Sequence, residues 1–375
     1  MNIGILGGGQ LARMMAQAGI PMGLQFTFLD PKPDACAAAL GRLLVADWDD
    51  AGALETLAEC DRITCDFENV PAGVLERLAE IRPVRPGAAA FAAAQDRLAE
   101  KRLFESIGLE VAPFAPVASR IELLEALDRV GYPAVLKTRR MGYDGKGQYL
   151  LRQREDLEPA WAALGDDPLI LEGWVPFDFE CAITVARDAA GNLRCYPLTR
   201  TVHDNGMLAL ARCPAGVDAA MAAAAAEAAR RLATHLEYVG CLTLELFAVG
   251  DRLLANEFAP RVHNSAHWTI EGTFCSQFEN HLRAVCDLPL GDPAARGAAL
   301  MVNWIGAIPE PVRLLGIDGL CWHNYGKSAR PGRKVGHATL LGHDLDDLRA
   351  RAGQLGPQLA SYTASLLNGL MKVSV

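Results

Sequence analysis

The sequence predicts a chain of mixed α/β and α+β class, and three observations support this prediction. A length of 375 residues is too great for one hydrophobic core and indicates two or three domains. The chain opens with an apolar strand over 1–6, a glycine turn, a helix pattern over 11–18 and a second strand over 25–29, which together form a βαβ unit. Further along, two apolar runs flank Gly250-Asp251 and read as an antiparallel hairpin.

The composition narrows the class of function. The formal net charge of −9 argues against broad nucleic-acid binding, because no excess of cations is present to neutralise a phosphate backbone. Cations do gather locally, at Arg139-Arg140 and over 330–334, which suits a small anionic ligand. With 51% hydrophobic and 22% charged residues, the chain has the composition of an ordinary globular protein.

The ten cysteines are scattered singly, and none forms a Cys-x-x-Cys pair or a zinc-ligand spacing. Several lie in apolar runs, so we expect buried thiols in a reducing cytosol. The N-terminus has no basic region followed by an apolar segment, and no uncharged run approaches bilayer length. We therefore expect a cytoplasmic protein that binds neither nucleic acid nor membrane.

The glycine turn after the first strand supports two interpretations. Gly7, Gly9 and Ala12 satisfy a loose dinucleotide-binding fingerprint, and Asp30 stands where a ribose-binding acid would lie. A nicotinamide-dependent dehydrogenase is therefore one hypothesis. The signal is weak, because a glycine turn at a helix N-terminus serves any phosphate or small ligand.

The run 63–71 reads as another strand that ends in acidic residues. The carboxyl ends of parallel strands form the ligand-binding edge of an open sheet, so Glu68 is expected to line the same crevice as Gly8, Gly9 and Gln10. A role in a helix N-cap segment is about equally consistent with its position.

The middle of the chain carries features suited to a nucleotide. A helix that begins at Gln95 marks the start of a new domain, and Lys137 closes an apolar strand over 134–138. A buried lysine requires an anionic partner, which a phosphate would supply. The amides of the glycine-rich run 139–148 would close over phosphates, with a tight hairpin turn as the alternative.

A second apolar strand, over 169–175, is followed by Glu180. Adenine is held by main-chain groups on a linker strand, and a ribose diol by a carboxylate, so this stretch offers both. His203 lies in an expected turn, where it is either an ordinary surface residue or faces a phosphate.

Two glutamates carry the strongest chemical signal. Glu245 and Glu257 lie on either side of the expected turn, so they can face each other on adjacent antiparallel strands. Two carboxylates and the amide oxygen of Asn256 suit a hard divalent cation that takes the rest of its shell from water and phosphate. A solvated strand face is the alternative, but the Arg, His, Asn and Ser residues over 261–267 favour a site.

Near the chain end we expect strands over 299–305 and 319–323 and a helix over 344–354. Between them lies a segment, 325–337, that concentrates lysine and arginine and is broken by glycine and proline. This pattern fits an anion-binding loop better than a helix face.

Taken in order, these motifs resemble the ATP-grasp superfamily, whose ligases hold ATP between two α+β lobes. The similarity narrows to the N5-carboxyaminoimidazole ribonucleotide synthetase family, the ATPase subunit of phosphoribosylaminoimidazole carboxylase, and covers nearly the whole chain. The motifs that carry it are Gly7-Gly-Gly-Gln-Leu, Glu68-Asn-Val, Tyr143-Asp-Gly-Lys-Gly-Gln, Asn256-Glu-Phe-Ala-Pro-Arg-Val-His-Asn-Ser and Arg330-Pro-Gly-Arg-Lys-Val-Gly-His. The Arg261–Ser265 and Arg330–His337 parts are the specific ones. Asp66 departs from the pattern, because many relatives carry Glu there.

The resemblance implies a Rossmann-like (pre-ATP-grasp) domain over 1–97, a two-lobed ATP-grasp domain over 98–292 and a small C-terminal domain over 293–375 that completes the active site. It implies ATP- and bicarbonate-dependent carboxylation of 5-aminoimidazole ribonucleotide through carboxyphosphate, in de novo purine synthesis. Mg²⁺ or Mn²⁺ would be the cofactor. A homodimer and a functional link to N5-carboxyaminoimidazole ribonucleotide mutase are expected.

The resemblance also assigns residues. The metal would be held by Glu245, Glu257 and Asn256. The residues expected to bind ATP are Lys101, Lys137, Gly142, Gly145, Lys146, Gly147, Gln148, Glu172, Gly173, Trp174, Val175, Glu180, His203, Asn256 and Glu257.

The residues expected to bind the ribonucleotide or bicarbonate are Gly8, Gly9, Gln10, Leu11, Glu68, Asn69, Tyr143, Asp144, Asn264, Ser265, Lys327, Arg330, Arg333 and Lys334. The residues expected to act in catalysis are Asp144, Arg261, His263 and Lys327. As a hypothesis, Asp144 accepts the amine proton during carboxylation.

Three rival functions are kept open. Formate-dependent glycinamide ribonucleotide transformylase shares the glycine turn and nucleotide apparatus, but the 261–265 and 330–337 motifs weigh against it. A dehydrogenase would explain the segment from Gly7 to Asp30 and leave both basic loops unexplained. A non-catalytic nucleotide-binding subunit fits least well, because every expected charge of the ATP site is present.

Overall fold

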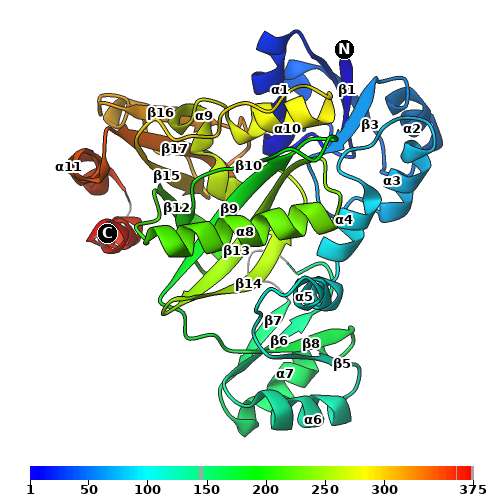
Figure 1. Cartoon of the computed structure of the whole chain (residues 1–375), viewed down its shortest axis with the longest axis vertical. Helices are drawn as coiled ribbons and strands as arrows, with labels where there is room; N and C mark the ends of the chain where they lie inside the picture. Colours follow the sequence, from blue (N-terminus) through cyan, green and yellow to red (C-terminus); the bar gives the residue numbers. More distant parts are fainter. Residues whose placement is uncertain (143–146, 360, 373–375) are drawn as a thin grey trace.

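The computed structural model describes residues 1–142, 147–359 and 361–372, and these residues form three β-sheets (Figure 1). A four-stranded parallel sheet comes first in the chain. A four-stranded antiparallel sheet forms a lobe that projects from the lower part of the molecule in Figure 1. A nine-stranded sheet occupies the centre and continues into the last third of the chain. No helix among the described residues is long and apolar enough to cross a membrane.

The first sheet has the strand order β3-β2-β1-β4, with all neighbours parallel. Its strands are β1 (Asn2–Leu6), β2 (Gln25–Asp30), β3 (Arg42–Val45) and β4 (Arg62–Cys65). Its helices are α1 (Gln10–Gly19), α2 (Ala51–Leu57), α3 (Ala72–Ala79) and α4 (Ala88–Ala94). Strand residues on the two faces, such as Ile5 and Leu6, enter separate buried clusters, which is why these strands are apolar throughout. The expected βαβ opening is confirmed.

The lobe is built from β5 (Phe114–Val117), β6 (Ala134–Thr138), β7 (Gln148–Leu151) and β8 (Leu169–Gly173), in the order β5-β8-β6-β7. Two helices, α6 (Arg120–Val130) and α7 (Leu157–Leu164), pack against the sheet through one apolar cluster. Ser119 begins α6 as a side-chain cap, since its Oγ accepts from the amide of Glu122.

The central sheet runs β14-β13-β9-β11-β12-β15-β17-β16, and β10 pairs with β9. These strands are β9 (Phe179–Arg187), β10 (Leu193–Cys195), β11 (Thr199–Asp204), β12 (Met207–Cys213), β13 (Gly240–Val249), β14 (Arg252–Ala259), β15 (Ala298–Ile305), β16 (Leu320–Asn324) and β17 (Lys334–Gly342). Helix α8 (Ala219–His235) crosses the face of β9 and β13 (Figure 1), and its alanine-rich stripe enters their core.

The last third of the chain does not form a separate sheet. Strand β15 pairs with β12 in antiparallel register, so the central sheet continues through the expected domain boundary at residues 292 and 293. The remaining helices are α5 (Arg97–Ser106), α9 (Thr269–Gly272), α10 (Gln277–Val285), α11 (Leu345–Leu355) and α12 (Ser361–Lys372). The predicted domain bounds therefore stay a prediction, although each predicted domain has its own strands.

Candidate active site

A cleft of about 1470 Å³ lies where the three sheets meet. Gln10 lines it from the start of α1, Lys137 from the lobe, and Glu257 from the central sheet. Motifs that are far apart in the sequence thus line one cavity, as was predicted for the residues at the ends of the parallel strands.

Glu245 and Glu257 face each other across β13 and β14 in antiparallel register, as predicted from their places around the turn. The register shifts immediately after this pair, so Asn256 is an extra residue on its strand, a β-bulge. Regular alternation would send Asn256 and Glu257 to opposite faces. Because of the bulge both residues line the cleft, which places three oxygen-bearing side chains near one another.

These side chains fit a divalent cation by the chemistry of their donors. Carboxylate and amide oxygens are hard ligands that leave several positions of Mg²⁺ for water and phosphate. Both glutamates line a cleft with cations close by, which favours a ligand site over the alternative of a solvated strand face.

Two histidines flank Glu245. The ring of His263 places Nε2 3.2 Å from Glu245 Oε1, and the ring of His203 places Nε2 4.0 Å from Glu245 Oε2. Burial and the nearby charge of Glu257 raise the pKa of Glu245 to about 7. His203 also bonds Glu180 Oε2 through Nδ1 at 2.7 Å, so it belongs to the cleft and is not an ordinary surface residue.

Glu257 has the opposite electrostatic environment. Its Oε2 lies 3.3 Å from Arg97 Nη1. Burial alone would raise the pKa of Glu257, but Arg97, Lys137 and Lys101 outweigh it and hold this pKa below its ordinary value. One carboxylate of the pair is therefore firmly ionised, and Glu245 titrates near neutrality.

Sequence reasoning missed Arg97 and Glu100, which both line the cleft from the first turn of α5. The available signal was Asp96, whose side chain caps this helix and fixes where the first turn points. Glu100 Oε1 accepts from the amide of Phe258 at 2.7 Å. Burial, followed by the charge of Glu257, raises the pKa of Glu100 to about 8.

A buried ion-pair group supports the nucleotide side of the cleft. Glu172 Oε2 lies 3.0 Å from Lys137 Nζ and 3.5 Å from Lys101 Nζ. Burial disfavours its charge, but the two ammonium groups prevail and lower the pKa of Glu172 to about 2. Lys137 lines the cleft, whereas Lys101 lies behind it and donates to the carbonyl of Asn256 at 2.6 Å. Direct phosphate contact by Lys101 stays a prediction.

The stretch expected to hold adenine also lines the cleft. The amides of Gly173 and Trp174 already donate to the carbonyls of Pro113 and Pro133. Beside them, the rings of Phe177 and Phe247 stack with centroids 4.8 Å apart.

The amides of the glycine turn after β1 are hydrogen-bonded to carboxylates of the same domain. The amide of Gly8 donates to Asp30 Oδ2 at 2.8 Å, and the amide of Gly9 donates to Asp66 Oδ2 at 2.5 Å. A Cβ at Gly9 would lie 2.6 Å from the same Asp66 oxygen, so this approach requires glycine. Burial raises the pKa of Asp66 to about 6. A dinucleotide pyrophosphate would need these amides, which counts against the dehydrogenase hypothesis.

Glu68 reaches across the cleft to Arg261. Its Oε2 accepts from Arg261 Nη2 at 2.6 Å and from Nε at 3.1 Å. Glu68 lies in the segment that leads into α3, but the N-cap residue of that helix is Pro71 and no side chain caps it. The Gln95 side chain holds the carbonyl of Glu68 at 2.7 Å.

Side-chain hydrogen bonds hold the segment that follows β14. His263 Nδ1 lies 2.9 Å from Ser265 Oγ and also accepts from the Ser265 amide, which leaves the proton on Nε2, toward Glu245. Asn264 exchanges two side-chain hydrogen bonds with Asn303 of β15. Ser265 is buried and is not among the residues that line the cleft, so its direct contact with a ligand stays a prediction.

Lysine and arginine side chains form the remaining wall of the cleft. Lys327, Arg330, Arg333 and Lys334 all line the cleft, and the Lys327 ammonium donates to Gln10 Oε1 of the first domain. Arg333 Nη1 donates to Ser328 Oγ at 2.7 Å within the same segment.

Most of the residues predicted to form the site line this cleft. The other predicted residues that line it are Leu11, Asn69, Gly142, Gln148 and Val175. Four predicted residues, Gly8, Lys101, Gly147 and Ser265, are not among those lining the cleft. Tyr143, Asp144, Gly145 and Lys146 lie outside the described residues.

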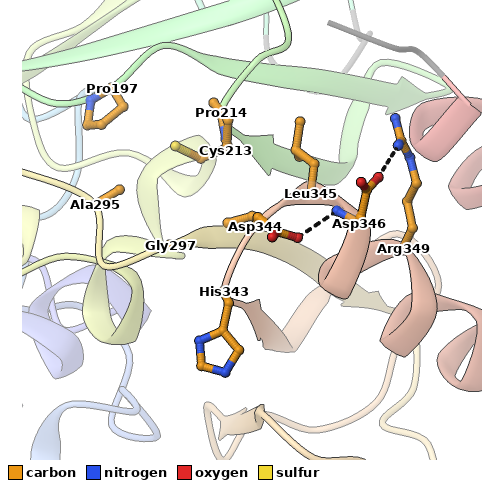
Figure 2. A pocket seen from close by; sticks show the side chains of 11 residues that line it. Pro197, Cys213, Pro214, Ala295, Gly297, His343, Asp344, Leu345, Asp346 and Arg349 are labelled. Carbon is orange, nitrogen blue, oxygen red and sulfur yellow. Dashed lines mark hydrogen bonds and ion pairs between the residues drawn. The ribbon is translucent and has the colours of Figure 1, made fainter.

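A second cavity, of about 640 Å³, lies at the start of α11 (Figure 2). Cys213 and Pro214 line one side, and Asp346 and Arg349, joined by an ion pair, line the other. None of the sequence-predicted site residues contributes to it.

Comparison with known families agrees with this arrangement. Residues 1–95 match the ribonucleotide synthetase preATP-grasp domain, residues 102–278 the ATP-grasp domain, and residues 299–351 the phosphoribosylaminoimidazole carboxylase C-terminal domain. The fold and the cleft thus define an ATP-grasp enzyme, and the expected fold class is confirmed.

Named relatives narrow the family. N5-carboxyaminoimidazole ribonucleotide synthase of Pseudomonas aeruginosa is 48% identical over 356 residues, which covers 95% of this chain and 98% of that protein. The crystal structure of the synthetase from Thermus thermophilus superposes with a TM-score of 0.92 at 49% identity, covering 96% and 98% of the two chains. The chain belongs to the N5-carboxyaminoimidazole ribonucleotide synthase family.

One further relative was solved with ligands. The Aspergillus clavatus enzyme, crystallised in complex with ADP and 5-aminoimidazole ribonucleotide, has a TM-score of 0.89 at 29% identity and covers 97% of this chain and 98% of its own. The expectation of an ATP-dependent ligase is confirmed by the family.

Proposed function

We propose that this chain uses ATP and bicarbonate to carboxylate the exocyclic amine of 5-aminoimidazole ribonucleotide, giving N5-carboxyaminoimidazole ribonucleotide. The observation that supports this beyond family membership is the order of charges in one cleft. The charge of Lys137 acts on Glu257, the charge of Lys334 acts on Glu245, and Arg261 lines the same cleft. Such a cleft suits a nucleotide and a second phosphorylated substrate, with an anion between them.

The nucleotide binds between the lobe and the central sheet. Lys137 pairs with its phosphates, Glu180 bonds the ribose hydroxyls, and main-chain groups near Val175 hold adenine. Glu245, Glu257 and Asn256 would hold Mg²⁺, which would supply charge neutralisation at the transferring phosphoryl group. A role for Mn²⁺ stays a prediction.

Bicarbonate binds beside the carboxylate pair, where Arg261 and His263 orient it. Its oxygen attacks the γ-phosphorus, ADP leaves, and carboxyphosphate forms. Arg261 is held in place by Glu68, so its guanidinium is preorganised at the position where negative charge accumulates. Enclosure by the three domains limits hydrolysis of the intermediate.

In the second step the exocyclic amine attacks the carboxyl carbon, directly or after release of CO2, and inorganic phosphate leaves. The amine loses one proton, for which Asp144 is our proposed acceptor. Lys327, Arg333 and Lys334 bind the 5′-phosphate of the ribonucleotide and so place the amine beside the carboxyl donor.

The reaction is expected in the cytoplasm, which the ten free cysteines support. The homodimer and the functional link to the mutase stay predictions.

The test measures ADP release with Mg-ATP and bicarbonate, with and without 5-aminoimidazole ribonucleotide, in the wild type, Glu257→Gln and Lys334→Ala. We expect strong stimulation by the ribonucleotide, loss of turnover in Glu257→Gln and a higher requirement for ribonucleotide in Lys334→Ala. Stimulation by glycinamide ribonucleotide with formate instead would retain the fold and overturn the substrate assignment. An absence of ATP turnover under every condition would overturn the proposed activity.

A further inference from the structure

Three neighbouring histidines form a group that the proposed reaction does not use. The rings of His323 and His337 stack with centroids 4.2 Å apart, and the His267 ring lies 5.1 Å from that of His337. His267 and His337 are fully buried. Within the described part of the chain, no cluster of three or more His, Cys, Asp or Glu is arranged to hold a metal ion. The contacts of this group are hydrogen bonds and ring packing.

One contact of this group leads to the basic segment. His337 Nδ1 and the Tyr325 hydroxyl are hydrogen-bonded at 2.8 Å, deep in the interior. Lys327 follows two residues later, with Nζ 5.8 Å from the centre of the Tyr325 ring. The Lys327 ammonium donates to Gln10 of the first domain. The orientation of Tyr325 therefore affects the position of the Lys327 ammonium.

Tyr325 is itself enclosed by the first domain. It is 2% exposed and belongs to the apolar cluster that contains Met14 and Met15 of α1. A buried hydroxyl that loses its partner incurs a desolvation cost, so the bond to His337 favours a single orientation of the ring.

The other contact leads to the segment beside the carboxylate pair. Gln277 Nε2 donates to His267 Nδ1 at 3.3 Å and to the carbonyl of His263 at 2.7 Å. Gln277 Oε1 accepts from the His263 amide at 2.8 Å. Gln277 thus binds both the amide and the carbonyl of His263, and it also contacts His267.

A third contact anchors the group to α9. His323 Nε2 lies 2.6 Å from Glu271 Oε1, and His323 pairs with His337 in the register of β16 and β17. The histidines therefore lie between two segments that line the cleft, one after β14 and one before β17.

We propose that His337 is a positioning residue, which holds Tyr325 so that Lys327 is presented to the phosphate of the ribonucleotide. Through ring contact with His267, the same residue keeps Lys327 in a fixed relation to His263. The identity of the ligand in this proposal rests on the proposed function; the mechanical link between His337 and Lys327 does not.

A matched pair of variants separates positioning from stability. Tyr325→Phe removes a hydroxyl bonded to a buried histidine at 2.8 Å, and Thr64→Val removes another, bonded to His281 at 2.8 Å. Thr64 is also fully buried, but it lies on β4, its histidine partner lies on α10, and neither residue is among those that line the cleft. Both variants are expected to lower the melting temperature.

Only Tyr325→Phe is expected to affect the ribonucleotide. Its KM for 5-aminoimidazole ribonucleotide should rise about fivefold to tenfold, as expected for weakening one charge-assisted bond, while its KM for ATP stays unchanged. His337→Leu should reproduce this change. His337→Asn, which keeps a polar group near the position of Nδ1, should restore much of the wild-type KM. Equal KM values for the ribonucleotide in Tyr325→Phe and Thr64→Val would overturn the proposal.

A second measurement does not depend on the substrate. The rate of acetylation of Lys327 in the ligand-free protein, followed by peptide mass spectrometry, should increase in Tyr325→Phe and His337→Leu but not in Thr64→Val. If the wild type shows no response to the ribonucleotide, the proposed function fails and this labelling still decides the positioning role. Unchanged labelling in all variants would overturn that role.

Discussion

Lys101 donates from Nζ to the main-chain oxygen of Asn256 at 2.6 Å, at the residue that the β-bulge inserts into β14. The bulge turns Asn256 and Glu257 to the same side of the sheet, and Lys101 binds a carbonyl that this irregularity leaves available. The lysine is 2% exposed. Its place behind the cleft wall indicates that it shapes the strand that carries Asn256 and Glu257.

Replacement of Lys101 by Met is therefore expected to destabilise the ligand-free protein. The change leaves a buried carbonyl without its donor and removes one of two cations from Glu172, at a cost of about 2 to 4 kcal/mol. Urea unfolding without nucleotide measures this cost. If Lys101 acted only on phosphate, Lys101→Met would raise the KM for ATP and leave the unfolding free energy of the ligand-free protein unchanged.

Arg97 provides a second test of the carboxylate pair. Arg97→Gln removes the cation nearest to Glu257, so both the pKa of Glu257 and its affinity for another cation should rise. We expect kcat to fall by about tenfold or more, because a preorganised positive charge is lost, while the Mg²⁺ concentration required for activity should decrease. Arg139→Gln is a suitable control, because Arg139 forms its ion pair with Asp96 at the same helix start rather than with Glu257. A Mg²⁺ requirement equal to that of the wild type would contradict the role of Arg97.

The raised pKa of Glu245 predicts a pH-dependent metal requirement. Protons compete with the cation below a pKa of about 7, so the Mg²⁺ concentration for half-maximal ADP release should increase as the pH falls. Between pH 8 and pH 6 we expect an increase of about tenfold at constant ionic strength. A requirement that does not change over this range would show that Glu245 titrates elsewhere or is not a ligand.

Local pattern was sufficient to predict the facing glutamates. Alternation of apolar residues sets the strands, and the turn at Gly250-Asp251 sets their register, so Glu245 and Glu257 could be paired from the sequence. The bulge at Asn256 could not be predicted, because the lysine that supports it comes from a helix more than a hundred residues earlier.

Other features also depend on distant partners. The glycine turn fits a dinucleotide site in sequence, but Asp30 and Asp66 bind the amides that such a ligand would use. The continuation of the central sheet from β12 to β15 joins strands separated by α8 and the hairpin, and no short pattern encodes that pairing. Motif similarity located the basic segment 325–337, whereas its one histidine, His337, contacts His267 and His323 only in the fold.

The environment of His281 predicts how the stability of the folded protein depends on pH. Its Nδ1 accepts from the amide of Cys241 at 3.1 Å, so the neutral ring carries its proton on Nε2 and donates to Thr64 Oγ1. Burial lowers the pKa of His281 to about 4. The unfolded chain binds a proton there near pH 6.5 and the folded chain does not, so this group makes the folded state less stable as the pH falls below 6.5.

The expected loss from His281 is about 2 kcal/mol between pH 7 and pH 5, and it levels off below pH 4. His281→Asn should unfold more easily at pH 7 but show a smaller decrease on acidification, measured by urea unfolding at both pH values. Other buried histidines add to the wild-type slope, so the informative quantity is the difference between wild type and variant. His235→Asn, at an exposed position on α8, is the control and should keep the full wild-type slope. If His281→Asn retained that slope as well, His281 would not be a source of the acid sensitivity.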